Sequence, residues 1–347
     1  MKNVIRFFSV VVALGVSISL FAQKQTIQEQ VVVQKVDTLF ESVSSLKVNG
    51  SFAQVVIVNS TNKSLGLKAK LTANEKVPGF SLTHKLNAGT LEISINYPSN
   101  NWVSHSGELE LTVPRGISVD IINSSGYVDL NSISDLKLTA LTTSGKIKLI
   151  DSKGDYALRS TSGDITIQKC VGALTVTSSS GKIIMNNTEG PLNLTNLSGD
   201  ISIIQHQGTI VTESTSGKQT LETITGDITA KSASALIKIS KAVGNLNLKS
   251  FSGTISLFDI KGMIYSDSGA GDQTGAQITL NGNSKFISTE GSIKMRIVNP
   301  TTEVTFKLLS ENGFIQARGT SKKKKLNLGK GALLIESFST TGGQVFN

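Results

Sequence analysis

Cysteine, histidine, proline and aromatic residues are all scarce in this sequence of 347 residues. Cys170 is the single cysteine, which excludes an internal disulfide framework and any CxxC-type metal or redox site. Three histidines, His84, His105 and His206, leave few ligands for a metal ion. We therefore expect no cofactor and no metal site, and no residue is assigned a catalytic role.

Aromatic residues make up 5% of the chain, whereas 38% of the residues are hydrophobic and 17% are charged. This is the composition of a globular protein and not of a disordered one. Aliphatic residues, serine, threonine and 32 glycines take the place of aromatics and long helix formers. Such a composition disfavours a helical bundle and indicates many short strands joined by turns.

The longest hydrophobic run lies at the N-terminus. Lys2 and Arg6 precede the apolar segment 7–22, and a polar stretch begins at Gln23. This is the layout of a secretory signal peptide that is cleaved after Ala22. An uncleaved membrane anchor is the alternative, but the run of 16 residues is short for a span of about 20. No cysteine lies near the predicted cleavage site, so lipoprotein attachment is excluded.

Cleavage would leave a moderately basic chain. The full sequence has 34 basic and 25 acidic residues, and loss of Lys2 and Arg6 leaves 32 basic residues and a net charge of +7. No second segment approaches the length of a membrane span, so the cleaved chain is expected to lie in the periplasm or at the surface of a bacterium. Its charge favours envelope glycans, anionic lipid or surface proteins as partners over nucleic acid.

An 18-residue repeat occupies the middle of the chain. Ser-Gly pairs begin at Ser125-Gly126 and recur after 19 and then every 18 residues up to Ser252-Gly253, with Ser234-Ala235 at the one irregular position. A second glycine series has the same spacing and lies nine residues after the first: Gly154, Gly172, Gly190, Gly208, Gly226, Gly244 and Gly262. Self-similarity at a fixed period is typical of a solenoid.

Residues alternate within each nine-residue unit. The second residue after the anchor is apolar in 14 of 15 units, with Gln219 the exception, and the fourth is apolar in 13, with Thr212 and Ser266 the exceptions. The segment 163–167, Gly-Asp-Ile-Thr-Ile, is typical. This alternation indicates a strand, preceded by a glycine that adopts a positive φ at a tight corner.

Because every unit repeats the same phase, we predict an all-β fold, a parallel β-solenoid (β-helix) with about 18 residues and two strands per coil. Coils should stack at roughly 4.8 Å. Two buried columns are predicted, one formed by Ile165, Ile183 and Ile201 and the other by Leu174, Leu192 and Ile210.

Four regions are predicted: a signal peptide (1–22), an N-terminal β capping region (23–120), a regular solenoid (121–266), and C-terminal wider β coils with a cap (267–347). The boundary near 266 is placed where the spacing breaks, in the Gly/Ser/Asp-rich segment Ser266–Gly275. We predict that this segment is a loop.

The repeated units resemble those of the bacterial putative-adhesin domain. The resemblance rests on the Ser-Gly-Asp-Ile-x-Ile and x-Gly-x-Leu-x-Val units, on the entry segment 111–114 (Leu-Thr-Val-Pro) and on the closing segment 331–343. It covers most of residues 46–345. The resemblance implies an exported β-solenoid domain of unknown function from the cell envelope, and the family offers no catalytic residues to carry over.

Equivalent positions stack into columns, so two chemical hypotheses can be weighed. Lys146, Asp164, Lys182, Asp200 and Lys218 alternate in charge along one column, as expected for favourable cross-strand pairs. The alternative is a glycosidase pair formed by Asp164 and Asp200, roughly 9.6 Å apart. Lys182 lies between these acids on a flat strand face, which favours the charge ladder.

Cys170 and His206 share another column, at the spacing of two coils. A thiol–imidazole dyad is the functional interpretation of this pair. Thr188 separates the two residues, and their backbones are expected to lie roughly 9.6 Å apart. We therefore predict a partly buried corner without a direct hydrogen bond between them.

Three surface features are candidate contact sites. The outward positions of the second strand face are mostly uncharged Thr and Asn residues, typical of a solvated face or of a glycan or protein contact. Lys322, Lys323, Lys324 and Lys325 form the one charge cluster, typical of a solvated loop or of a site for anionic lipid or lipopolysaccharide. Trp102 lies in a polar loop, either as a lid over the first coil or as a stacking partner for a sugar ring or a protein.

We therefore expect an exported, non-enzymatic β-solenoid scaffold, adhesin-like, that presents strand faces and loops for envelope, glycan or protein interaction. A polysaccharide-active β-helix enzyme is one alternative, and a periplasmic accessory or sensor protein of an envelope-stress system is another. An enzyme would need a groove with clustered acids and bases on adjacent coils, whereas the columns show paired opposite charges.

Overall fold

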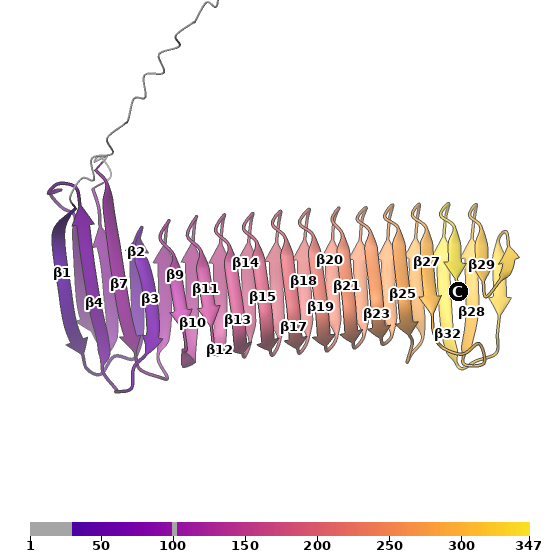
Figure 1. The fold of residues 1–347 in the computed structure, drawn as a ribbon, viewed down its shortest axis with the longest axis horizontal. Coiled ribbons are helices and arrows are strands. Elements are labelled where there is room, and N and C mark those ends of the chain that lie inside the picture. Colours follow the sequence, from indigo (N-terminus) through magenta and orange to yellow (C-terminus); the bar gives the residue numbers. More distant parts are fainter. Residues whose placement is uncertain (1–29, 99–102) are drawn as a thin grey trace, which may run out of the picture.

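The computed structural model describes residues 30–98 and 103–347, and every regular element in these ranges is a β-strand. The strands stack along one axis into a rod (Figure 1). Each coil contributes one strand to each of two long faces, which we call face A and face B. The predicted all-β parallel solenoid is confirmed. The predicted signal peptide, 1–22, and Trp102 lie outside the described residues.

Neighbouring strands within a face are hydrogen-bonded. Face A consists, in spatial order, of β5 (Ser81–Asn87), β6 (Thr90–Asn96), β2 (Ser45–Ser51), β8 (Ser118–Asn123), β10 (Ser134–Thr142), β12 (Lys153–Ser160), β14 (Leu174–Ser178), β16 (Leu192–Asn196), β18 (Ile210–Ser214), β20 (Ile228–Ser232), β22 (Leu246–Ser250), β24 (Ile264–Ser268), β26 (Ser284–Ser288), β32 (Leu333–Ser339), β28 (Val304–Ser310) and β31 (Lys325–Leu328). Face B consists, in the same direction, of β1 (Val31–Phe40), β4 (Leu65–Ala73), β7 (His105–Val113), β3 (Gln54–Asn59), β9 (Val128–Asn131), β11 (Ile147–Ile150), β13 (Ile165–Val171), β15 (Ile183–Glu189), β17 (Ile201–Gln207), β19 (Gln219–Thr225), β21 (Ile237–Val243), β23 (Ile255–Lys261), β25 (Gln273–Thr279), β27 (Ile293–Ile297), β33 (Gln344–Phe346), β29 (Ile315–Ala317) and β30 (Thr320–Lys322).

The two predicted core columns are confirmed by the strand register. Ile183 pairs with Ile165 on one side and with Ile201 on the other, and each of these side chains is at most 1% exposed. Leu174, Leu192 and Ile210 pair in the same way on face A. Alternation with period two therefore places one apolar set from each face in the core, where burial stabilises the rod.

The Ser-Gly glycines are required for a different reason from the one predicted. None of Gly145, Gly163 and Gly181 has a positive φ, so the prediction of a left-handed corner is wrong for this series. Instead, a Cβ added at Gly181 would lie 2.1 Å from the carbonyl oxygen of Gly163. The coils approach each other too closely here for a side chain. In the second series the prediction is right for most members, as at Gly190 with φ +119°.

A second bend in each coil was not apparent in the sequence. Lys169, Asn187, Gln205 and Thr223 are equivalent residues in successive coils, and each has a φ between +51° and +58°. Each of them lies two residues before the end of its face B strand, where the strand bends toward the next corner. The sequence signal is weak because no glycine marks the position, and asparagine is the only one of the four types that commonly adopts this conformation.

A buried column of small polar side chains caps the corners between the faces. Thr142, Ser178, Asn196 and Ser268 are equivalent residues at the end of face A strands, and each donates to the carbonyl oxygen of a corner glycine. These side chains replace the strand pairing that the backbone loses at the turn.

Three glutamines lie fully buried in the otherwise aliphatic column of face B. Gln219 accepts a hydrogen bond from Thr212 Oγ1 (2.6 Å) and donates from Nε2 to Ser214 Oγ (2.8 Å) and to the Lys231 carbonyl (2.6 Å). Gln273 and Gln344 donate to Ser268 and Ser339 in the same way. The exceptions Thr212 and Gln219 in the apolar pattern thus satisfy each other across the core.

The two ends of the rod do not follow chain order. Coil β2–β3 lies between β6–β7 and β8–β9, although it precedes both pairs in the sequence. At the other end, coil β32–β33 lies between β26–β27 and β28–β29, although it is the last in the sequence. A coil can lie between two coils that are not its sequence neighbours because it offers the same apolar strands as they do.

The prediction that Ser266–Gly275 forms a loop is wrong. Its first residues belong to β24, its last to β25, and the corner between them resembles the earlier ones. The chain continues the stack, with Tyr265 opposite Lys285 and Gln273 opposite Ile293. The period therefore lengthens from 18 to 20 residues at this point without a break in the coil.

Candidate functional site

The described residues contain no group of three or more His, Cys, Asp and Glu side chains that could hold a metal ion. Across the same ranges, no helix is long and apolar enough to cross a membrane. The candidate sites predicted from the sequence within these ranges lie on surfaces and in columns of the solenoid.

The column that contains Asp164 and Asp200 is occupied by backbone contacts. Asp164 Oδ1 accepts a hydrogen bond from the Lys182 backbone N–H (3.0 Å), and Asp200 Oδ1 accepts one from the Lys218 backbone N–H (3.0 Å). Within this column only Lys146 forms an ion pair, with Asp164 at 4.0 Å. Each acid thus accepts a hydrogen bond from the backbone of the coil that follows it.

The column that contains Cys170 and His206 has no direct contact between the two. Thr188 lies between them, with its Oγ1 2.9 Å from His206 Nδ1, and the Cys170 thiol donates to the Gln168 carbonyl (3.2 Å). Burial raises the pKa of Cys170 to about 11, so the thiolate that nucleophilic chemistry needs is disfavoured. The predicted partly buried corner is in fact fully buried.

We expect the same column to make the stability of the rod depend on pH. Burial lowers the pKa of His206 to about 4, whereas it is near 6.5 in an unfolded chain. The unfolded chain therefore binds the proton more tightly, and the stabilisation present above pH 6.5 is lost as the pH falls through 4. Between pH 7 and pH 4.5 we expect His206 to account for a loss of roughly 2–3 kcal/mol in the free energy of unfolding.

Urea denaturation at the two pH values checks this expectation. His206→Ile is the matched variant, because Ile224 fills the equivalent position one coil further on. The variant should lose less stability than the wild-type chain over the same pH range. Equal losses in the two proteins would contradict the assignment to His206.

The four lysines Lys322–Lys325 lie at one end of the rod. Lys322 ends β30, which pairs antiparallel with β29 at the end of face B. Lys325 begins β31, which pairs antiparallel with β28 at the end of face A. All four side chains are exposed. None of them forms an ion pair with another described residue.

Exposed apolar side chains border these lysines. Leu309 lies directly opposite Lys325 and next to Phe338 in the register, and the exposed fractions of the two apolar side chains are 46% and 37%. Phe314 follows the corner after β28 and is 51% exposed. We call the surface formed by Leu309, Phe314, Lys322–Lys325 and Phe338 the cationic tip.

The charge at this end is unbalanced. Residues 303–330 contain seven basic and two acidic residues, a net charge of +5, whereas the whole chain carries +9. Sequence reasoning found the lysines but not the three apolar residues. Their outward positions in the strands were the only signal, and the unusual order of the last coils hid which residues would be neighbours.

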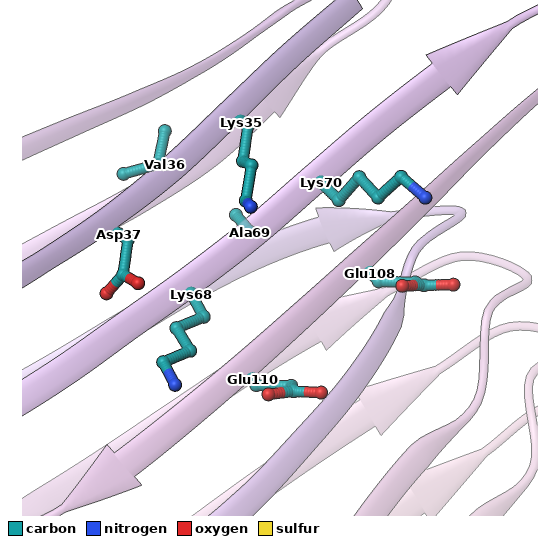
Figure 2. Close-up of a pocket in the computed structure, with 8 residues that line it drawn as sticks. All are labelled: Lys35, Val36, Asp37, Lys68, Ala69, Lys70, Glu108 and Glu110. Carbon is teal, nitrogen blue, oxygen red and sulfur yellow. The ribbon is translucent and has the colours of Figure 1, made fainter. Parts of the chain in front are cut away.

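At the opposite end, face B carries a shallow hollow of about 260 Å³ (Figure 2). Three lysines and three acids line it, on β1, β4 and β7: Lys35, Asp37, Lys68, Lys70, Glu108 and Glu110. Lys68 lies opposite both Asp37 and Glu110 in the register. The charges are balanced and exposed, so the hollow does not concentrate charge of one sign as the cationic tip does.

The family model of Toastrack DUF4097 matches residues 43–223, slightly more than half of the chain. No curated protein matches the chain. Eight chains of solved structures are similar to it, and three of them are described here. A putative adhesin from Parabacteroides merdae is 8% identical with a TM-score of 0.29, over 88% of this chain and 95% of that one. A putative cell adhesion protein from Clostridium sporogenes is 10% identical with a TM-score of 0.22, over 90% and 99%. A putative lipid binding protein from Parabacteroides distasonis is 13% identical with a TM-score of 0.31, over 76% and 96%. At these TM-scores the three structures do not indicate a ligand or a partner for this chain.

Proposed function

The chain belongs to the Toastrack DUF4097 family, and from that premise we propose that it is an exported, non-enzymatic scaffold of the bacterial envelope. In this proposal the rod acts in an adhesin-like way and contacts an anionic lipid surface through the cationic tip. One observation carries the proposal: four exposed lysines without an ion pair to a described residue lie at one end of the rod, and the last of them, Lys325, lies opposite exposed Leu309, which is next to Phe338.

The physical basis is the combination of charge and apolar area. Lysines near an anionic bilayer contribute about 1 kcal/mol each to binding. Phenylalanine and leucine side chains at the same surface can enter the boundary between headgroups and acyl chains, which adds the free energy of burying apolar area. At the cationic tip Lys325, Leu309 and Phe338 lie on adjacent strands, so one surface can present charge and apolar area together.

The non-enzymatic part of the proposal is supported by how the acids are used. Asp164 and Asp200 accept backbone hydrogen bonds on an open strand face, and a regular ladder of this kind gives no enclosed environment in which one carboxyl would differ from its partner.

Cosedimentation with vesicles tests the lipid contact. The purified protein should bind vesicles of phosphatidylcholine that contain phosphatidylglycerol, and should not bind vesicles of phosphatidylcholine alone. Replacing Lys322–Lys325 by glutamine should weaken binding roughly 10²- to 10³-fold. Raising the salt concentration should weaken wild-type binding as well, because salt screens exposed charges.

A matched control separates a local site from net charge. Four exposed lysines on the regular part of the rod are replaced by glutamine, which lowers the net charge by the same amount: Lys182, Lys218, Lys238 and Lys294. This variant should bind anionic vesicles nearly as the wild-type chain does. Equal weakening in the two quadruple variants, or equal binding of the wild type to neutral vesicles, would contradict the proposal.

A further inference from the structure

Among the described residues, four strands form the open edges of the rod, and three of them are protected against pairing with another chain. An unpaired edge presents free N–H and C=O groups on which a further strand can pair. β30 and β31 are only three and four residues long and carry lysines. β5 is protected by Gln34, whose side-chain Nε2 donates to the Leu82 carbonyl (3.0 Å) and whose Oε1 accepts from the Leu82 N–H (2.8 Å).

The fourth edge strand, β1, carries one lysine and an irregularity between Val32 and Gln34, but it is much longer than β30 and β31. It is ten residues long, contains no proline, and pairs along only one side, with β4, among the described residues. Its exposed apolar side chains include Leu39, which is 69% exposed, and Val32, which is 52% exposed. A long edge with exposed apolar residues is typical of a strand that pairs with another chain.

The charges of β1 are complementary to a second copy of β1 in one register. Lys35 and Asp37 are its only charged residues, and both lie exposed on the outer face (Figure 2). Directly opposite residues of an antiparallel pair point to the same face. A two-fold axis at Val36 therefore places Lys35 of each copy opposite Asp37 of the other. A shift by two residues in either direction would place Lys35 opposite Lys35, or Asp37 opposite Asp37.

We propose that β1 is an interface through which two copies of this chain join end to end, with their β1 strands antiparallel about Val36. This inference goes beyond the proposed function and rests on different residues. Such an interface uses the same patch on both copies and closes after two, which gives a dimer and not a fibre. Face B would continue from one rod into the other, and the two cationic tips would lie at opposite ends of the assembly.

Charge reversal at β1 tests the register. Sedimentation velocity over a range of concentrations should show a dimer for the purified wild-type chain. Asp37→Lys and Lys35→Asp should each weaken dimerisation roughly ten- to a hundredfold, because each variant places like charges opposite each other twice. An equimolar mixture of the two variants should dimerise again, because every opposed pair in the mixed dimer is complementary. Lys63→Asp, an exposed charge reversal away from the edge, should dimerise as the wild type does.

Disulfide trapping tests the position of the axis. In the proposed pair, Val36 lies opposite its own copy, with a Cα–Cα separation of roughly 4.5–5.5 Å, which a disulfide can bridge. Val36→Cys should therefore form a covalent dimer under mild oxidation. Thr38→Cys is the matched control, because Thr38 would lie opposite Gln34 and far from its own copy. The natural Cys170 is buried and does not interfere.

Three results would overturn the proposed β1 interface. The first is a wild-type chain that remains monomeric at all concentrations. The second is a dimer that both single charge reversals leave intact, and the third is one that Thr38→Cys traps as readily as Val36→Cys. Circular dichroism of each variant confirms that a lost dimer does not reflect a lost fold.

Discussion

Replacing Ile183 with aspartate should remove about 5 kcal/mol or more from the free energy of unfolding. Ile183 is fully buried between Ile165 and Ile201. Loss of its apolar volume alone costs roughly 2–5 kcal/mol, and a carboxyl without a partner in an apolar column adds several kcal/mol more. Urea denaturation at neutral pH measures the change. Stability like that of the wild type would contradict the two-strand register of the core.

The pH dependence of this variant identifies the cause. Burial should raise the pKa of the introduced carboxyl above its unfolded value of about 3.9. The folded state then holds the proton more tightly, so the penalty is smallest below about pH 3.9 and grows as the pH rises. Ile183→Asn is the matched control, since it loses the same apolar contacts without a titrating group and should show no added pH dependence. Ile183→Val should cost only about 1 kcal/mol.

Replacing Gly208 with valine should have a comparably large effect, through the backbone. Gly208 has a φ of +136°, and a Cβ there would lie 2.3 Å from the Gly190 carbonyl oxygen. A side chain would be strained in this conformation, at about 1–3 kcal/mol. The clash can be relieved only if these two coils separate, which would weaken the hydrogen bond from the Gly190 N–H to the Gln207 carbonyl between them. We expect a total loss of about 3–5 kcal/mol.

Thermal and urea denaturation check this prediction against a neighbouring substitution. Thr209→Val adds a side chain of the same shape at the next residue, which is exposed, and should change the stability by less than about 0.5 kcal/mol. If Gly208→Val melted with the wild type, close approach of the coils would not be the reason for glycine at this position.

Several details of the core were visible in the sequence only as exceptions to a pattern. Thr212 and Gln219 broke the alternation of apolar residues in adjacent units. The structure joins them by a hydrogen bond across the core, so the two departures compensate each other. The sequence could not reveal this, because the partner of a buried polar group depends on which side chains of the two faces meet. The neighbours at the cationic tip could not be predicted from the sequence either. Phe338 lies next to Leu309 because β32, although it is later in the sequence, pairs with β28.

The sequence by itself determined the solenoid, its period and its buried columns. A strand that alternates with period two and recurs every 18 residues places equivalent side chains in contact, so local pattern and long-range packing agree. Only the tertiary structure decided the order of the end coils, because every coil offers similar apolar strands and the repeat contains nothing that specifies its neighbour. That order determines which edges stay open and which surfaces form. β1 became a long open edge, and Lys325 came to lie opposite Leu309, through pairings between strands that no local pattern relates.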